Sequence, residues 1–251
     1  MPIYKSTEAI NKIETPAMFK GEDLVFGNNV FIQVDGGTVT YDGRFKIHTF
    51  TTAGTSSLTL VPSNLSDNNS IEYLIQAGGG SGARIENATT FASAGGAGAI
   101  MSGSYTPTIG GSFEVIVGAG GANPGGTNYD GENGKNSSLF GITACSGSGG
   151  IRNNSGGGNC YFSGSSAGNF NNGAGASNQA NAIDNGGALD AYINSGSISN
   201  ISGTPTEYGR GGRRYNQFDL NIKGAGGNGG NSSNDSTVGN DGVIIIRYRY
   251  K

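Results

Sequence analysis

The chain has 251 residues, of which only 34% are apolar and 13% are charged, and its formal net charge is −3. Disordered chains are usually poor in apolar residues but rich in charge, so this composition favours a folded chain whose packing is dominated by the backbone. Nucleic-acid binding needs a basic stripe, and the largest Lys/Arg group is the pair Arg213-Arg214, so we expect no nucleic-acid partner. The longest apolar run, residues 243–246, is too short for membrane insertion.

Few residues offer metal-binding or nucleophilic chemistry. The chain contains two cysteines, Cys145 and Cys160, and one histidine, His48, which cannot build a Cys/His zinc site without carboxylates. We therefore expect no metal and no cofactor. The cysteines form either one bridge or, in a reducing compartment, two free thiols. The first residues lack the apolar core of a signal peptide, so we expect a protein made in a cytosol and kept there or released by lysis.

Residues 1–43 are predicted to form a separate lead segment. The spacing of Ala9, Ile10 and Ile13 predicts a short helix over residues 6–13, which is too short to be stable without a partner surface. The apolar runs 24–26 and 30–34 flank Gly27-Asn28-Asn29 and predict a hairpin.

Apolar alternation predicts the later β-strands. They cover residues 45–49, 58–60, 71–77, 113–117 and 243–250, enough for a small β-sandwich or jelly-roll-like scaffold. In the last strand Ile244, Ile246, Tyr248 and Tyr250 share one face, whereas Ile245, Arg247, Arg249 and Lys251 share the other, which we expect to face solvent. His48 lies in the first of these strands, and we expect it to face outward rather than to act as a catalytic base.

Glycine is concentrated in one region of the chain. Of the 48 glycines, 42 lie in residues 78–242 and only 6 precede them. A flexible linker has a similar composition, but these tracts are bracketed by predicted strands. We therefore predict that short glycine-rich segments return repeatedly to the β scaffold and form an inserted bundle of polyglycine-II helices, with hydrogen bonds between neighbouring segments. Residues 44–251 would form this mainly β, glycine-rich domain.

The order of these pieces resembles a known family. It runs FKIHTFTTAGTSSLTL, IEYLIQAGGGSG, AGGAGAIMSGSYTPTIGGSFEVIVGAGG, GENGKNSS and finally GNDGVIIIRYRY, over roughly residues 44–251. This pattern resembles the glycine-rich domain of bacteriophage tail-fibre and adhesin proteins. A glycine-rich extracellular region of receptor kinases also looks similar, but this chain lacks its cysteine content.

The resemblance implies a non-enzymatic virion protein, a tail-fibre tip or adhesin that recognises the host surface. Its partners would be a bacterial receptor, either a glycan or an outer-membrane protein, and other virion proteins bound through residues 1–43. By analogy with phage fibres it could be a homotrimer, and its location would be the virion, after assembly in the host cytoplasm. The alternative is a structural virion component, such as a capsid decoration, collar or baseplate fitting, that binds no receptor.

Large side chains that interrupt the glycine tracts are the predicted receptor-binding residues, because Tyr and Arg are enriched at binding hot spots. The alternatives are a cover for the scaffold or a subunit interface. These candidates are Tyr192, Tyr208, Arg210, Arg213, Arg214, Tyr215 and Phe218.

Two weaker hypotheses remain. The aromatic group Tyr161, Phe162 and Phe170 is expected to pack locally. A polysaccharide-cleaving enzyme would need two carboxylates at a fixed separation, for which Asp184 with Asp190 or Asp130 with Glu132 are the candidate pairs.

Overall fold

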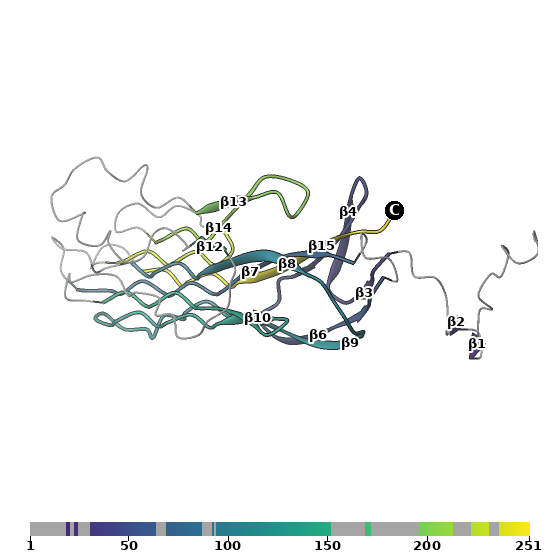
Figure 1. Cartoon of the computed structure of the whole chain (residues 1–251). Helices are drawn as coiled ribbons and strands as arrows, with labels where there is room; N and C mark the ends of the chain where they lie inside the picture. Colours follow the sequence, from purple (N-terminus) through teal and green to yellow (C-terminus); the bar gives the residue numbers. More distant parts are fainter. Residues whose placement is uncertain are drawn as a thin grey trace, which may run out of the picture.

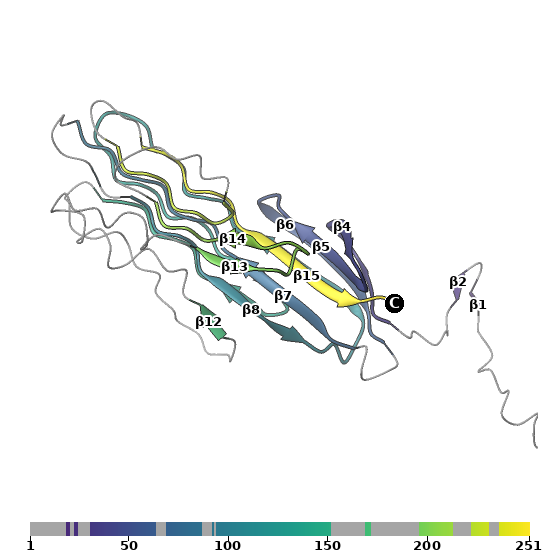
Figure 2. The same ribbon diagram turned by 90° about the horizontal axis from the view of Figure 1, so that it is seen from above.

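The computed structural model describes residues 31–63, 69–86, 92, 94–151, 196–212, 222–230 and 236–251, together with the backbone of 19–20, 23–24 and 169–171. The main body has two parts. Two large β-sheets stack on each other, and glycine-rich segments extend from one end of them (Figures 1 and 2).

The two large sheets are antiparallel throughout. In the five-stranded sheet the order is β11 (Ile142–Ala144), β10 (Ser137–Leu139), β9 (Gly111–Val117), β6 (Gly54–Val61) and β3 (Gln33–Asp35). In the six-stranded sheet it is β12 (Asn169–Asn171), β8 (Ile100–Tyr105), β7 (Ile71–Gln76), β15 (Val243–Arg249), β5 (Phe45–Phe50) and β4 (Thr38–Asp42). Two small pairs complete the described strands, β1 (Phe19–Lys20) with β2 (Asp23–Leu24) and β13 (Ser197–Ser199) with β14 (Thr206–Tyr208).

The apolar core lies between the two sheets, because alternate residues of each strand point inward. Leu58 and Leu60 of β6 belong to one buried cluster with Ile244 and Ile246 of β15. The odd-numbered Ile245 points the other way, into a second cluster that includes Ile201 and Tyr208 from the β13–β14 region. The expectation that the second face of β15 faces solvent is therefore wrong for Ile245, whereas Arg249 at the end of the strand is exposed.

The predicted boundary at residue 43 does not separate two structural units. β3 pairs with β6 in one sheet, and β4 pairs with β5 in the other, so residues 33–42 are part of the sandwich. The chain crosses between the sheets at Gly36 and Gly37, whose φ angles are 119° and 66°. Such values favour glycine.

His48 holds this crossing in place, and the expectation that it faces outward is wrong. The imidazole is fully buried, and its Nδ1 lies 2.6 Å from the carbonyl oxygen of Gly36. A carbonyl can only accept, so Nδ1 carries the proton and Nε2 accepts from the hydroxyl of Tyr248 at 3.2 Å. Burial lowers the pKa of His48, and burial also raises the pKa of Tyr248 to about 12.

Two further predictions concern the lead segment. The hairpin predicted between 24–26 and 30–34 runs through residues 25–30, which lie outside the described residues, while the described β2 and β3 pair with β1 and β6. The helix predicted over residues 6–13 lies outside the described residues.

The predicted bundle of polyglycine-II helices is also wrong. The described residues are mainly β, with antiparallel sheets, and this part of the chain contains no helix. The glycine tracts in this part of the chain form neither helices nor long strands. Figure 2 shows them running side by side as continuations of the strands. We call these segments the glycine lattice: residues 77–83, 94–99, 118–122, 131–136, 145–150, 209–212, 224–230 and 236–242.

The segment 77–83, which continues β7, is the hub of the glycine lattice. Its N–H groups donate in turn to three neighbouring segments, and the order repeats every three residues. Gly80, Ser81 and Gly82 donate to the carbonyls of Gly96, Glu132 and Thr237 at 2.9, 2.9 and 3.0 Å. Ala77, Gly78 and Gly79 donate to the same three segments, at Ala99, Lys135 and Asn240. The hub carbonyls accept from three further segments, through the N–H groups of Gly121, Gly147, Gly150, Gly227 and Gly230.

Six neighbours can surround the hub only if it lacks side chains at the points of closest approach. A Cβ added at Gly79 would lie 2.0 Å from the carbonyl oxygen of Ala225, and one added at Gly80 would lie 2.1 Å from that of Ser148. Both separations are far shorter than any real contact, and the obstacle is backbone rather than a movable side chain. Glycine is therefore a steric requirement of the hub.

Substitution of a hub glycine tests this requirement. Gly80→Ala is expected to lower the free energy of unfolding by about 3 kcal/mol or more, because two hydrogen-bonded segments must separate. Urea titration with linear extrapolation measures the change. The control is Gly43→Asn, at a turn with φ of 56° and no atom within 4 Å of an added Cβ. Asn tolerates that conformation, so the control should change stability by less than about 1 kcal/mol. Equal losses would contradict the steric argument.

Protonation of His48 tests the crossing between the sheets. The folded-state pKa lies below the ordinary value of 6.5, so the unfolded chain binds the proton more tightly. The contribution of neutral His48 to the free energy of unfolding is therefore fully present above pH 6.5. It is lost as the pH falls below 6.5 toward the folded-state pKa. His48 is the only histidine. The free energy of unfolding, measured from pH 7.5 to 5.5, should therefore fall with pH in the wild type but not in His48→Gln. If His48→Gln keeps the pH profile of the wild type, His48 is not the group that causes this pH dependence.

Candidate functional site

The structure describes two of the seven predicted receptor-binding residues, Tyr208 and Arg210. Both lie at or just after β14, where the chain enters the glycine lattice. The other five lie outside the described residues: Tyr192, Arg213, Arg214, Tyr215 and Phe218.

Tyr208 is a core residue, which removes it from the candidate binding surface. Its exposed fraction is 3%, and it packs with Ile245 and Ile100 on the outer face of the six-stranded sheet. In the sequence, Tyr208 directly precedes a glycine tract. Its burial depends on the fold of β13–β14 back onto the sheet, which no local pattern indicates.

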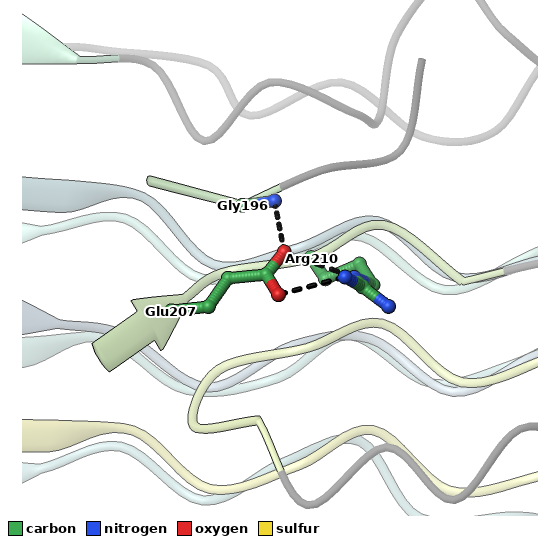
Figure 3. A network of polar contacts seen from close by, with 3 residues as sticks. All are labelled: Gly196, Glu207 and Arg210. Carbon is green, nitrogen blue, oxygen red and sulfur yellow. Dashed lines mark hydrogen bonds and ion pairs between the residues drawn. The ribbon is translucent and has the colours of Figure 1, made fainter. Parts of the chain in front are cut away.

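The guanidinium group of Arg210 is bound by the carboxylate of Glu207 (Figure 3). Its Nε donates to one carboxylate oxygen at 2.9 Å, and its terminal nitrogen donates to the other at 2.7 Å. The backbone N–H of Gly196 also donates to Glu207, at 2.7 Å. The carboxylate thus joins the two ends of the described segment 196–212, on either side of the β13–β14 hairpin. We call this network the Glu207 clamp. Glu207 is not among the receptor-binding residues predicted from the sequence, which are all aromatic or Arg.

The end of the glycine lattice away from the sheets is a second candidate surface. We call it the distal end: residues 84–86, 92, 123–130, 230 and 236. Arg84 forms bridges with Tyr129 and Gly230, and the N–H of Ala92 donates to the carbonyl of Gly230 at 3.1 Å. Three parts of the chain that are far apart in the sequence, around residues 84–92, 129 and 230, therefore meet here.

Polar side chains bind these segments of the distal end to one another. The hydroxyls of Tyr129 and Ser236 lie 2.6 Å apart, and the amide of Asn123 donates to the carbonyl of Ser236 at 2.9 Å. The side chain of Asn128 accepts from the N–H of Glu86 at 2.8 Å. The exposed turn 124–127 lies between Asn123 and Asn128. Its position is fixed at both ends, as a recognition loop on a rigid support requires.

Small polar side chains also complete hydrogen bonds inside the glycine lattice. The hydroxyl of Ser81 donates to Ala122 and accepts from the N–H of Glu132. The hydroxyl of Ser137 donates to Gln76 and accepts from the N–H of Gly118. These serines resemble spacers in the sequence, so only their partners reveal what they do.

One of the two carboxylate pairs lies in the described part of the chain. Asp130 and Glu132 are exposed on the segment that returns from the distal end, and Asp184 and Asp190 lie outside the described residues. The described part of the chain contains no cluster of three or more His, Cys, Asp or Glu side chains that could hold a metal ion. Within that part, no helix is long and apolar enough to cross a membrane.

A cavity of about 250 Å³ lies on the flank of the sandwich between β5 and β6. Seven of its eleven lining residues are Thr or Ser, and none of the lining side chains is charged. The lining residues are Gly37, Thr38, Thr49, Phe50, Thr51, Thr52, Ala53, Gly54, Thr55, Ser56 and Ser57.

The family model of the glycine-rich domain matches residues 51–249, which include most of both large sheets and the whole glycine lattice. No curated protein matches the chain significantly.

The Glu207 clamp can be tested by a double-mutant cycle of Glu207→Gln and Arg210→Met. The two side chains are 23% and 26% exposed, so solvent screens the pair in part. We expect a coupling of about 1 kcal/mol in the free energy of unfolding, because the ion pair is bidentate. Gln can still accept from Gly196, so the cycle isolates the Arg210 contribution. A coupling near zero would mean that the ion pair of the Glu207 clamp does not help to hold the two ends of residues 196–212 together.

Proposed function

We propose, from the premise that the chain belongs to the glycine-rich domain family, that it is a non-enzymatic adhesin of a bacteriophage fibre. It would sit at the fibre tip in the virion and recognise the surface of a bacterial host. The receptor would be a glycan or an outer-membrane protein, and residues at the start of the chain would attach it to other virion proteins.

The observation that carries this proposal is the position of the distal end. Segments that continue strands of both sheets are hydrogen-bonded to one another along their length, and they bring residues 84–86, 92, 123–130, 230 and 236 to a single end. A support of this kind loses little conformational entropy when its loops dock, which favours binding. Several copies on one particle would multiply a weak single-site affinity.

The proposed contact residues follow from this arrangement. Tyr208 is excluded by burial, and Arg210 is committed to Glu207. The proposal therefore rests on the exposed turn 124–127 together with Arg213, Arg214, Tyr215, Phe218 and Tyr192 from the sequence analysis. Arg side chains would bind carboxylates or phosphates of surface glycans in two-point fashion.

Binding to cells tests the proposal. Fluorescently tagged protein is titrated onto a panel of bacterial strains, and bound fluorescence is measured by flow cytometry. We expect saturable binding to at least one strain, and a loss of tenfold or more in affinity, about 1.4 kcal/mol, for Arg213→Ala/Arg214→Ala. The matched control is Arg249→Ala/Lys251→Ala, which removes the same charge from exposed positions at the end of the sandwich away from the glycine lattice (Figure 1).

Each result has a distinct meaning. Equal losses in the two double variants would show non-specific attraction to the cell surface and contradict the proposed site. No saturable binding by folded protein would favour a structural virion component instead. Release of reducing sugar from the host polysaccharide, abolished in Asp130→Asn/Glu132→Gln, would contradict the non-enzymatic assignment.

A further inference from the structure

The two large sheets end in four edge strands, and these differ in length. β3, β11 and β12 have three residues each, whereas β4 has five. Short edges are one way in which proteins avoid pairing with other chains. β4 is therefore the edge strand with the longest row of backbone groups available for another strand.

β4 also lacks the other usual protection of an edge. Its sequence, Thr-Val-Thr-Tyr-Asp, contains no proline and no lysine, and all five residues are exposed. Val39 is 40% exposed and Tyr41 is 61% exposed. Figure 2 shows β4 at the rim of its sheet, and among the described strands its only partner is β5.

We propose that β4 pairs with β4 of a second copy of this chain, in an antiparallel arrangement about a twofold axis that passes beside Thr40. Thr40 would then lie opposite Thr40 of the second copy, and Val39 would lie opposite Tyr41. The two six-stranded sheets would join into one continuous sheet. An interface of this kind is self-complementary, as twofold symmetry requires.

The side chains favour this register over a parallel one. Val39 and Tyr41 lie on the same face of β4, so antiparallel pairing forms two aromatic–aliphatic contacts, which are favourable across strands. It also places each Asp42 opposite Thr38, with the two carboxylates at opposite ends of the ladder. A parallel, in-register pair would set the Asp42 carboxylates side by side, where like charges repel.

The size of the contact sets its strength. Five residues on each side bury less area than the roughly 1,200 Å² of a specific, stable interface, so we expect a weak dimer that exchanges rapidly. Such a pair would act where copies are already held close together, as on one particle, because a high effective concentration compensates for low affinity.

Disulfide trapping tests the register. In Thr40→Cys, the two introduced cysteines would lie directly opposite each other at the proposed twofold axis. The Cα atoms of such opposed residues are about 4.5–5.5 Å apart in an antiparallel ladder. This separation suits a disulfide. Under a glutathione redox buffer, non-reducing gels should show roughly tenfold more disulfide-linked dimer than the wild type, whose native cysteines provide the background.

Val39→Cys is the matched control, since it changes the neighbouring exposed residue of the same strand. In the proposed register the two thiols introduced by this substitution are offset by two residues and lie beyond the roughly 7 Å reach of a disulfide. Trapping should therefore stay at the wild-type level. Equal trapping in both variants, stronger trapping in Val39→Cys, or no trapping above background in folded Thr40→Cys would each overturn the proposal. Circular dichroism verifies folding, which substitution of these exposed residues should not disturb.

Discussion

The backbone of the glycine tracts must find hydrogen-bond partners outside its own segment, and the rest of the structure depends on this constraint. Buried N–H and C=O groups are almost always paired in proteins. The hub 77–83 meets that requirement by donating to three neighbouring segments and accepting from three others. Its neighbours must approach within contact distance of the backbone, which a Cβ at Gly79 or Gly80 would prevent. Composition and architecture are thus two aspects of one requirement.

The sandwich supplies what the glycine lattice lacks. Glycine loses more conformational freedom on folding than any other residue, and the lattice has few large apolar side chains to offset that cost. The strands bury Leu, Ile and Val between two sheets and fix the ends of the segments that continue from them. Ser81, Ser137 and Asp241 then complete backbone hydrogen bonds near these junctions and along the hub. The apolar core and the hydrogen-bonded region are therefore interdependent.

Polar contacts fix the places where the chain changes direction. His48 and Tyr248 secure the crossing at Gly36, the Glu207 clamp joins the two ends of residues 196–212 beside β13–β14, and Tyr129 with Ser236 joins segments at the distal end. Each contact connects residues from different elements. The proposed adhesin depends on this rigidity, since loops that are already positioned lose little entropy on binding. β4 differs because, among the described strands, one side of its backbone has no partner.

The sequence by itself determined the strands with strong alternation. Residues 45–49, 71–77, 113–117 and 243–250 agree closely with β5, β7, β9 and β15, because alternation is a local property. Local patterns could not reveal short strands such as β10 and β13, the burial of His48, or the partnership of Arg210 with Glu207. Likewise, glycine content predicted close packing of backbones, but the predicted helix bundle was wrong. Only the tertiary structure decided these points, because each depends on contacts between residues far apart in the chain.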